Sequence, residues 1–252
     1  MKILLLVTLH VAFCLPILAQ QRPDKNLNDM RGAVHTVRTT VSYDLKKAGK
    51  VAEKGSETER HETYDRQGNL SAKRSIFGTS ADRSLFSRDA QGNRIEKLTV
   101  LPSPDPNAPP PPPPPAHPER DKEGFLDFIT AYQFDAAKNR LEATKHRRSG
   151  ELLWIDTYIF DEKGLLIESA RKDSTEAAYG SKSKFTYKRN EQGIKTESIS
   201  YDATDGKVSE RTLYQNIEVD KQGNWIKRTE TTQSAKGTNY PILTTVRQIT
   251  YY

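Results

Sequence analysis

A six-residue turn motif recurs along this chain and constrains its fold more than any other feature. The clearest copy is YDRQGN at residues 64–69, in which Asp65 stands three residues before Gly68. The Asp of such a turn can accept a hydrogen bond from the backbone two residues on, and the glycine can take positive φ. This combination is typical of a type I turn followed by a bulge, which joins two antiparallel strands. Five related copies begin at Arg88, Phe134, Phe160, Arg189 and Val219.

The spacing of these turns predicts the architecture. Successive turn Asp or Asn residues lie 24, 26, 29 and 30 residues apart, and one interval of 46 contains a proline-rich insertion at residues 102–118. Most intervals hold a second turn signal near the middle, so one period contains two strands and two turns. We therefore predict an all-β fold: an antiparallel up-and-down meander of repeated hairpins that forms a curved open sheet or a partly closed barrel. The turn glycines should have positive φ.

The first residues are typical of an export signal. Lys2 supplies a positive charge, residues 3–18 form the apolar run, and Ala19 is the small residue before the predicted cleavage point. Cleavage is favoured over a lipid anchor at Cys14, because the bulky Phe13 precedes that cysteine. The predicted domains are a signal peptide at 1–19, a polar unstructured lead at 20–31 and a hairpin-repeat domain at 32–252. The location is then periplasmic or secreted, with no transmembrane span in the mature chain.

Two further segments could bind another molecule: a proline-rich segment and a basic run. The prolines at residues 109–115 favour an extended rod that serves as a docking ligand or, as we prefer, forms a tolerated loop insertion. The run KHRR at 145–148 is the densest basic stretch and precedes Ser149 and Gly150. It predicts a solvated hairpin tip and not a nucleic-acid patch, because no aromatic residues are interleaved with it.

No motif for catalysis stands out. The histidines after the signal peptide are far apart in sequence, and phosphate-loop, nucleophile-elbow and zinc-protease motifs are absent. Single turn aspartates are better explained as turn caps than as calcium ligands, since calcium needs about six to eight oxygens. We therefore predict a protein that is not an enzyme, with no catalytic, cofactor-binding or metal-binding residues.

Aromatic and aliphatic residues recur on one face of the predicted strands, which places their rings in a stripe. Such a stripe forms a core more often than a sugar-binding surface. The segment at 152–160 is apolar on both faces, which predicts a strand buried on two sides. The candidate ligand-binding aromatics are Tyr132, Trp154, Tyr158, Tyr187 and Trp225.

The recurring aromatic-Asp-x-x-Gly-Asn unit resembles the tyrosine-aspartate repeats of rearrangement-hot-spot (RHS) proteins, over residues from about Tyr64 to Trp225. The layout is also similar to small exported bacterial proteins of unknown role. The resemblance implies hairpin architecture and an extracytoplasmic bacterial setting, and it supplies no catalytic residue. We expect a non-enzymatic exported β-repeat protein that is a binding or structural module of the cell envelope, with an unknown protein or an envelope glycan as partner. The alternative is a carbohydrate-binding module that uses exposed aromatic residues.

Overall fold

The computed structural model describes residues 24–47, 50–54, 58–77, 80–101, 126–174, 183–202 and 205–252. The predicted signal peptide and the insertion at 102–118 lie outside these ranges. The two helical elements are α1 (Asp24–Leu27) and the 3-10 turn η1 (Ala136–Lys138). The strands are β1 (Val34–Lys47), β2 (Lys50–Lys54), β3 (Thr58–Tyr64), β4 (Leu70–Phe77), β5 (Ser80–Arg88), β6 (Arg94–Leu101), β7 (Leu126–Asp135), β8 (Arg140–Arg147), β9 (Leu152–Phe160), β10 (Leu166–Asp173), β11 (Ser183–Arg189), β12 (Lys195–Asp202), β13 (Val208–Val219), β14 (Trp225–Ser234) and β15 (Leu243–Tyr251).

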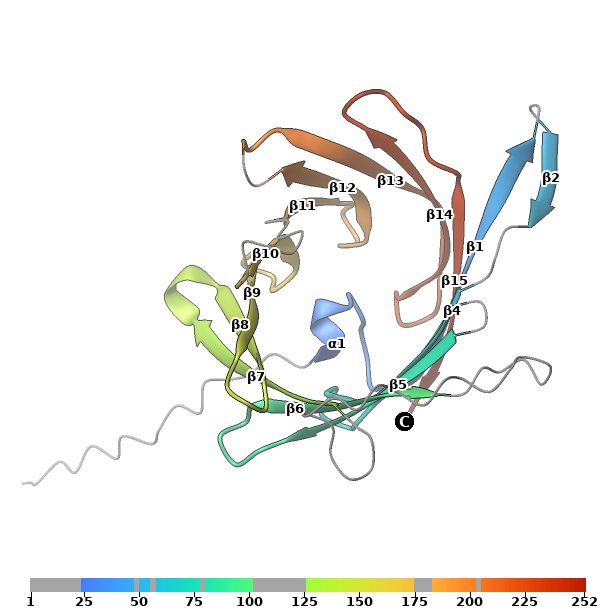
Figure 1. The fold of residues 1–252 in the computed structure, drawn as a ribbon. Helices are drawn as coiled ribbons and strands as arrows, with labels where there is room; N and C mark the ends of the chain where they lie inside the picture. The colour runs from blue at the N-terminus through green and yellow to red at the C-terminus, as the bar shows by residue number, and fades with distance from the viewer. Residues whose placement is uncertain are drawn as a thin grey trace, which may run out of the picture.

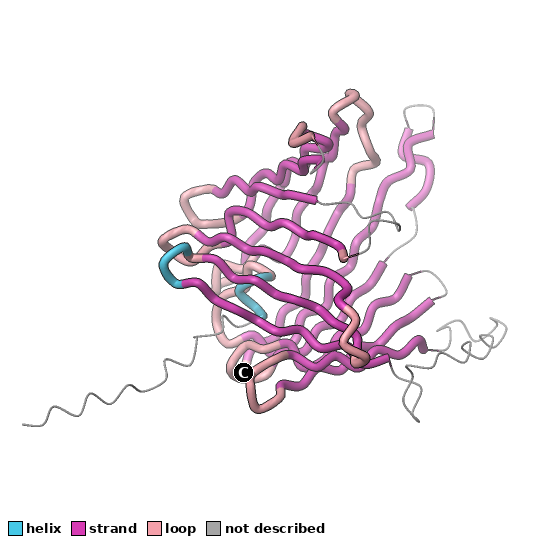
Figure 2. Tube along the Cα trace, turned by 60° about the vertical axis from the view of Figure 1, so that its left-hand side comes forward, coloured by secondary structure: helices cyan, strands magenta, loops and turns pink. Residues whose placement is uncertain are grey.

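The strands form one closed barrel. From β3 onward each strand pairs antiparallel with the next along the chain, and β15 returns to pair with β1. Because β1 also pairs with β3, 14 strands close the ring, and β2 extends only the end of β1. Figure 1 shows this ring of strands around α1, and Figure 2 shows the strands running side by side across the wall. The predicted all-β meander is confirmed, and its sheet is closed.

All six repeat turns lie at one end of the barrel, here called the repeat-turn end, because each follows an odd-numbered strand from β3 to β13. In the first, the Gly68 N–H donates to the Asp65 carbonyl at 2.9 Å, and the Asp65 carboxylate accepts from the Asn69 N–H at 2.8 Å. The prediction of positive φ is confirmed for the turn glycines Gly68, Gly92, Gly164, Gly193 and Gly223. In the copy without glycine, Asn139 takes the left-handed conformation instead.

Residues 24–33, here called the N-terminal plug, lie inside the barrel at the repeat-turn end. The Asp24 side chain is 5% exposed and lies between Arg88 on β5 and Arg94 on β6. The Lys25 N–H donates to the Gly68 carbonyl at 3.0 Å. The expectation of an unstructured lead at 20–31 is therefore wrong for this part of the chain. The acidic residues of the plug form ion pairs with cationic side chains that project from the inner wall.

Side chains alternate between the inner and outer faces of the wall, as strand geometry requires. Those beside the plug face inward, and their immediate neighbours along each strand face outward. The outward positions carry several ion pairs. Arg140–Glu142 lies along β8. The cross-strand pairs are Arg38–Glu59, Lys184–Glu168, Lys188–Glu197 and Arg211–Glu197. Within the described ranges, no helix is long and apolar enough to cross a membrane.

Two sequence interpretations of single segments change in the structure. The segment at 152–160 is β9, one wall strand of the barrel, and only Phe160 is buried, with 3% exposure. It is therefore not a strand buried on two sides. Of the basic run at 145–148, Lys145 faces inward with 12% side-chain exposure and pairs with Glu96 at 2.6 Å. The solvated tip begins only at Arg148, because β8 continues through Arg147.

Candidate functional site

The five predicted ligand-binding aromatics all project from the inner wall. They come from different strands, with Tyr132 on β7, Trp154 and Tyr158 on β9, Tyr187 on β11 and Trp225 on β14. The cross-strand register places Tyr132, Leu141 and Tyr158 on the same face of the sheet, because Phe134 pairs with Leu141 and Leu141 pairs with Tyr158. The rings thus line the lumen and do not form an outward stripe.

Cationic side chains stack on four of these rings, which sequence reasoning missed. Arg88 and Arg94 lie over Tyr132 with their guanidinium carbons 5.5 and 5.7 Å from the ring centroid. The Lys145 and Arg171 charges lie 4.8 and 4.5 Å from the Trp154 centroid. Further cations lie over the other two rings: Lys195 at 3.9 Å over Tyr187, and Arg228 and Arg247 at 3.9 and 3.6 Å over Trp225. The lumen is therefore lined by aromatic–cation pairs.

The plug neutralises part of this positive charge. Asp24 pairs with Arg88 at 3.4 Å and with Arg94 at 3.3 Å. Asp29 pairs with Arg189 at 2.7 Å and with Lys195 at 3.3 Å. Each plug carboxylate thus bridges two inner-wall cations. Together, the two carboxylates hold the plug to the wall at two places.

The larger lumen cavity has a volume of about 440 Å³ and lies against β9 to β13. Its lining combines tyrosine rings with hydroxyl groups: the Tyr187 hydroxyl is 2.7 Å from Ser169 Oγ, and the Tyr214 hydroxyl donates to Ser198 at 3.3 Å. Burial raises the pKa of the Tyr187 and Tyr214 hydroxyls. These phenols are therefore neutral hydrogen-bonding groups at physiological pH.

A smaller cavity of about 240 Å³ lies on the other side of the plug, against β1, β3, β14 and β15. Trp225, Arg228 and Arg247 line it, together with Glu230 and the plug residue Asn28. Arg228 pairs with Glu230 at 2.9 Å. Burial, and after it the nearby Arg228 charge, lowers the pKa of Arg247 to about 10.

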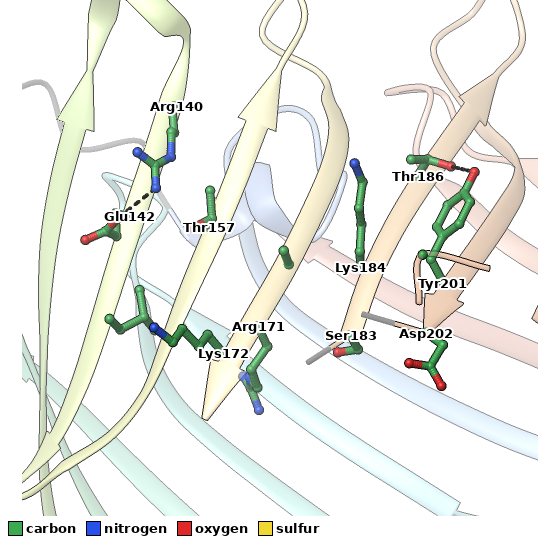
Figure 3. Close-up of a pocket in the computed structure, with 13 residues that line it drawn as sticks. Arg140, Glu142, Thr157, Arg171, Lys172, Ser183, Lys184, Thr186, Tyr201 and Asp202 are labelled. Carbon is green, nitrogen blue, oxygen red and sulfur yellow. Dashed lines mark hydrogen bonds and ion pairs between the residues drawn. The ribbon is translucent and has the colours of Figure 1, made fainter. Parts of the chain in front are cut away.

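A groove of about 690 Å³ crosses the outer face of β8 to β12 (Figure 3). Two of its ionic groups are matched by neighbours on the same face: Arg140 donates to Glu142 at 2.9 Å, and Lys184 pairs with Glu168 at 2.9 Å. Tyr201, the aromatic residue in its lining, is hydrogen-bonded to Thr186 at 3.3 Å. The groove is larger than either lumen cavity, but it gathers fewer aromatic rings, and Arg140 and Lys184 pair with carboxylates on the same face.

The described residues contain no group of three His, Asp or Glu side chains that could hold a metal ion. His61 lies on the outer face beside Glu59, which also binds Arg38. The arrangement of charged side chains in the lumen is one of ion pairs and stacked cations, which suits binding by electrostatics and ring contacts.

No family model matches this chain, and a search of curated proteins finds no match. Among solved structures it is similar to a porin-like protein from Bacteroides uniformis, with 9% identity, a TM-score of 0.41 and coverage of 88% of this chain and 98% of that chain. A porin-like protein from Bacteroides vulgatus matches with 11% identity, a TM-score of 0.37 and coverage of 84% and 97%. A putative outer membrane lipoprotein-sorting protein domain from Vibrio parahaemolyticus matches with 8% identity, a TM-score of 0.29 and coverage of 92% and 90%.

These findings correct the resemblance to RHS-type repeat proteins. No family model matches this chain, and this includes any model of the RHS repeats. The hairpins of this chain also close on themselves into one barrel. The turn motif is thus a local solution for joining strands, and it does not mark membership in that repeat family.

Proposed function

We propose that this chain is a non-enzymatic, exported binding protein of the cell envelope that takes a small molecule into its lumen. The observation that carries the proposal is the contrast between the faces of the wall. The inner face gathers aromatic rings with stacked cations around two cavities, and the outer face carries ion pairs between neighbouring strands. Ligand sites in proteins combine aromatic walls with a few placed polar groups, which is the composition of the inner face.

The outer face argues against a pore embedded in lipid. A membrane barrel presents an outward apolar band about 25 Å tall, and a Lys or Arg at the bilayer midplane costs about 2–4 kcal/mol. Here Glu197 on β12 binds Lys188 on β11 and Arg211 on β13, so a charged network spans three neighbouring strands. Such a wall suits an aqueous compartment of the envelope.

A carbohydrate ligand is the second candidate, and the larger cavity favours it. Tyr158, Tyr187 and Tyr214 place three rings there beside serine hydroxyls. Sugar rings stack on aromatic faces and exchange hydrogen bonds with hydroxyl groups. This candidate differs from the carbohydrate-binding module expected from the sequence, which would use aromatic residues exposed on its surface, because the rings here face the lumen.

Probe binding tests the proposal. We expect the neutral fluorescent amphiphile N-phenyl-1-naphthylamine to bind the purified protein, and maltoheptaose to compete with it if the ligand is a sugar. The variant Ser198→Phe fills the larger cavity and should weaken probe binding about tenfold or more, since the lost contacts are those of a buried ring.

The matched control is Gln133→Phe, which adds the same ring at an exposed position on β7. It should bind the probe as the unchanged protein does, with circular dichroism confirming that both variants fold. Binding in the lumen is excluded if the probe fails to bind the unchanged protein, and binding in the larger cavity is excluded if both variants bind it equally well.

A further inference from the structure

We infer that Trp225, Arg228 and Arg247 form a subsite for the monoanionic head group of a small organic ligand, such as a carboxylate or a sulfonate. The inference rests on the proposed binding in the lumen and names the chemistry of one part of that site. The subsite lies in the smaller cavity, beside the plug residue Asn28. The rest of the ligand would extend into the lumen.

Two positive charges converge on one ring in this subsite. The guanidinium carbons of Arg228 and Arg247 lie 3.9 and 3.6 Å from the Trp225 centroid. Each cation–π contact is favourable, but the charge on Arg228 disfavours the charge on the buried Arg247. An anion that reaches both guanidinium groups would remove this repulsion and gain charge-assisted hydrogen bonds.

Two carboxylates line the cavity beside these two arginines, Glu230 and Glu62, but among the described residues only Glu230 makes an ion pair with them. Glu230 pairs with Arg228 at 2.9 Å and also accepts from the Thr245 hydroxyl at 2.9 Å. Glu62 accepts from the Tyr64 hydroxyl at 3.1 Å and makes no ion pair with a described residue. Its charge still acts on Arg247 from a distance and partly offsets the repulsion from Arg228. Among the described residues, Arg247 is the arginine of this subsite that makes no ion pair, so one negatively charged head group would complete its contacts.

A comparison with Arg189 shows that the state of Arg247 is unusual within this barrel. Arg189 is similarly enclosed, and its guanidinium donates to Asp29 at 2.7 Å, to the Gly193 carbonyl at 2.9 Å and to the Leu166 carbonyl at 2.8 and 3.1 Å. For Arg247, Nε and Nη1 are buried without a hydrogen-bond partner among the described residues. Buried polar groups without partners are rare in native proteins, and an unplaced ligand is one explanation for them.

The size of the cavity limits the ligand part that it can hold. Its volume of about 240 Å³ is smaller than the roughly 300 Å³ at which pockets for whole drug-sized ligands begin. A head group with its first ring or chain atoms fits within this space.

A matched pair of fluorescent probes tests the subsite. Anilinonaphthalene sulfonate and N-phenyl-1-naphthylamine share the same aromatic body, and only the first carries a negative charge. We expect the sulfonate probe to bind the unchanged protein about tenfold more tightly, since hydrogen bonds to a charged group are worth about 1.5–3 kcal/mol. Arg247→Met should reduce sulfonate binding to the level of the neutral probe and leave the neutral probe unaffected.

Arg228→Gln is the second variant and should give a smaller loss of the same kind, because Glu230 already holds part of its charge. The control is Arg83→Met, which removes an exposed arginine from β5 and should change neither probe. Thermal melting by circular dichroism establishes that each variant is folded. If both probes bind the unchanged protein equally, or if Arg247→Met binds the sulfonate normally, the subsite is refuted and lumen binding stands. If neither probe binds, the proposed function itself fails.

Discussion

The two ends of the barrel use glycine in the same backbone conformation but under different constraints. At the repeat-turn end, a Cβ atom on Gly68 or Gly193 would lie 2.6 or 2.9 Å from the side chains of Lys25 and Leu165, respectively. At the opposite end, Gly150, Gly206 and Gly237 also have positive φ, and nothing lies within 4 Å of a Cβ atom built on them. The comparison teaches that the repeated turn does more than reverse the chain. It leaves room for the plug to pack against the turn backbone.

The largest effect should follow removal of a plug carboxylate. Asp24→Asn leaves Arg88 and Arg94 without their shared anion inside the barrel, which should cost about 3 kcal/mol. Differential scanning calorimetry measures the loss in unfolding free energy, and limited proteolysis shows whether the plug alone is released. Asp205→Asn removes the exposed partner of Lys207 at the opposite end and should leave the melting temperature unchanged. Equal effects at the two ends would contradict the difference drawn here.

Substitution of an asparagine in the last repeat turn should give the next largest loss of stability. Asn224 is 1% exposed and binds the plug through two hydrogen bonds, one from the Arg31 N–H at 2.7 Å and one to the Arg31 carbonyl at 3.0 Å. Asn224→Ala should therefore cost about 2 kcal/mol in chemical unfolding. The equivalent Asn93 binds only within its own turn, where its side chain donates to Asp89 at 2.9 Å. Asn93→Ala should lower the free energy of unfolding by less than half as much. An equal loss would mean that the contact of Asn224 with the plug does not contribute the extra stability.

A pair of glycine substitutions separates backbone strain from packing. Gly193→Ala and Gly237→Ala both force alanine to positive φ, at +75° and +82°, which costs about 1–2 kcal/mol in each. Only at Gly193 does the new methyl group also meet Leu165 and Arg31, at 2.9 and 3.0 Å. We expect about 1 kcal/mol of additional loss there, measured by urea unfolding. A Gly237→Ala variant that is the less stable of the two would reverse the comparison.

The smallest effect concerns the pKa values of two aspartates and their dependence on salt. The pKa of Asp89 is lowered chiefly by the hydrogen bond from the Asn93 side chain, and the pKa of Asp205 is lowered chiefly by that from Lys207. Both carboxylates therefore contribute stability above the unfolded-state pKa, and lose it as the pH falls through the folded-state value. In 1 M salt, where the Debye length is about 3 Å, NMR titration should show the Asp205 pKa rising and the Asp89 pKa nearly constant. A rise at Asp89 as large as that at Asp205 would contradict this account.

The turns were predictable from sequence because their interactions are local. Asp65 completes its hydrogen bonds within five residues, and the glycine conformation follows from the turn type. Alternation along the strands likewise placed the aromatic residues on one face. The same local rules failed for segment 152–160, because a barrel wall strand has one face toward the lumen and the other toward solvent.

Closure, the plug and the stacked cations depend on distant parts of the chain. Thr36 meets Thr250 across the closing ladder, 214 residues away, and Asp24 meets Arg94 across 70 residues. In sequence each of these is an ordinary threonine, aspartate or arginine with no local signal. Arg247 could have been identified as a ligand-binding candidate only from its inward position on β15. That position follows from the register with β14 and β1.

The closing ladder between β1 and β15 also decides when the barrel can form. A growing chain offers β1 early, and β3 can pair with one of its edges, while the other edge must wait for the last strand. Until then, two exposed strand edges invite pairing with other chains. Contacts of such long sequence separation also slow folding. A molecule with this topology spends a vulnerable interval after synthesis in which holdase chaperones and proteases compete for it, and that interval ends when the final hairpin docks.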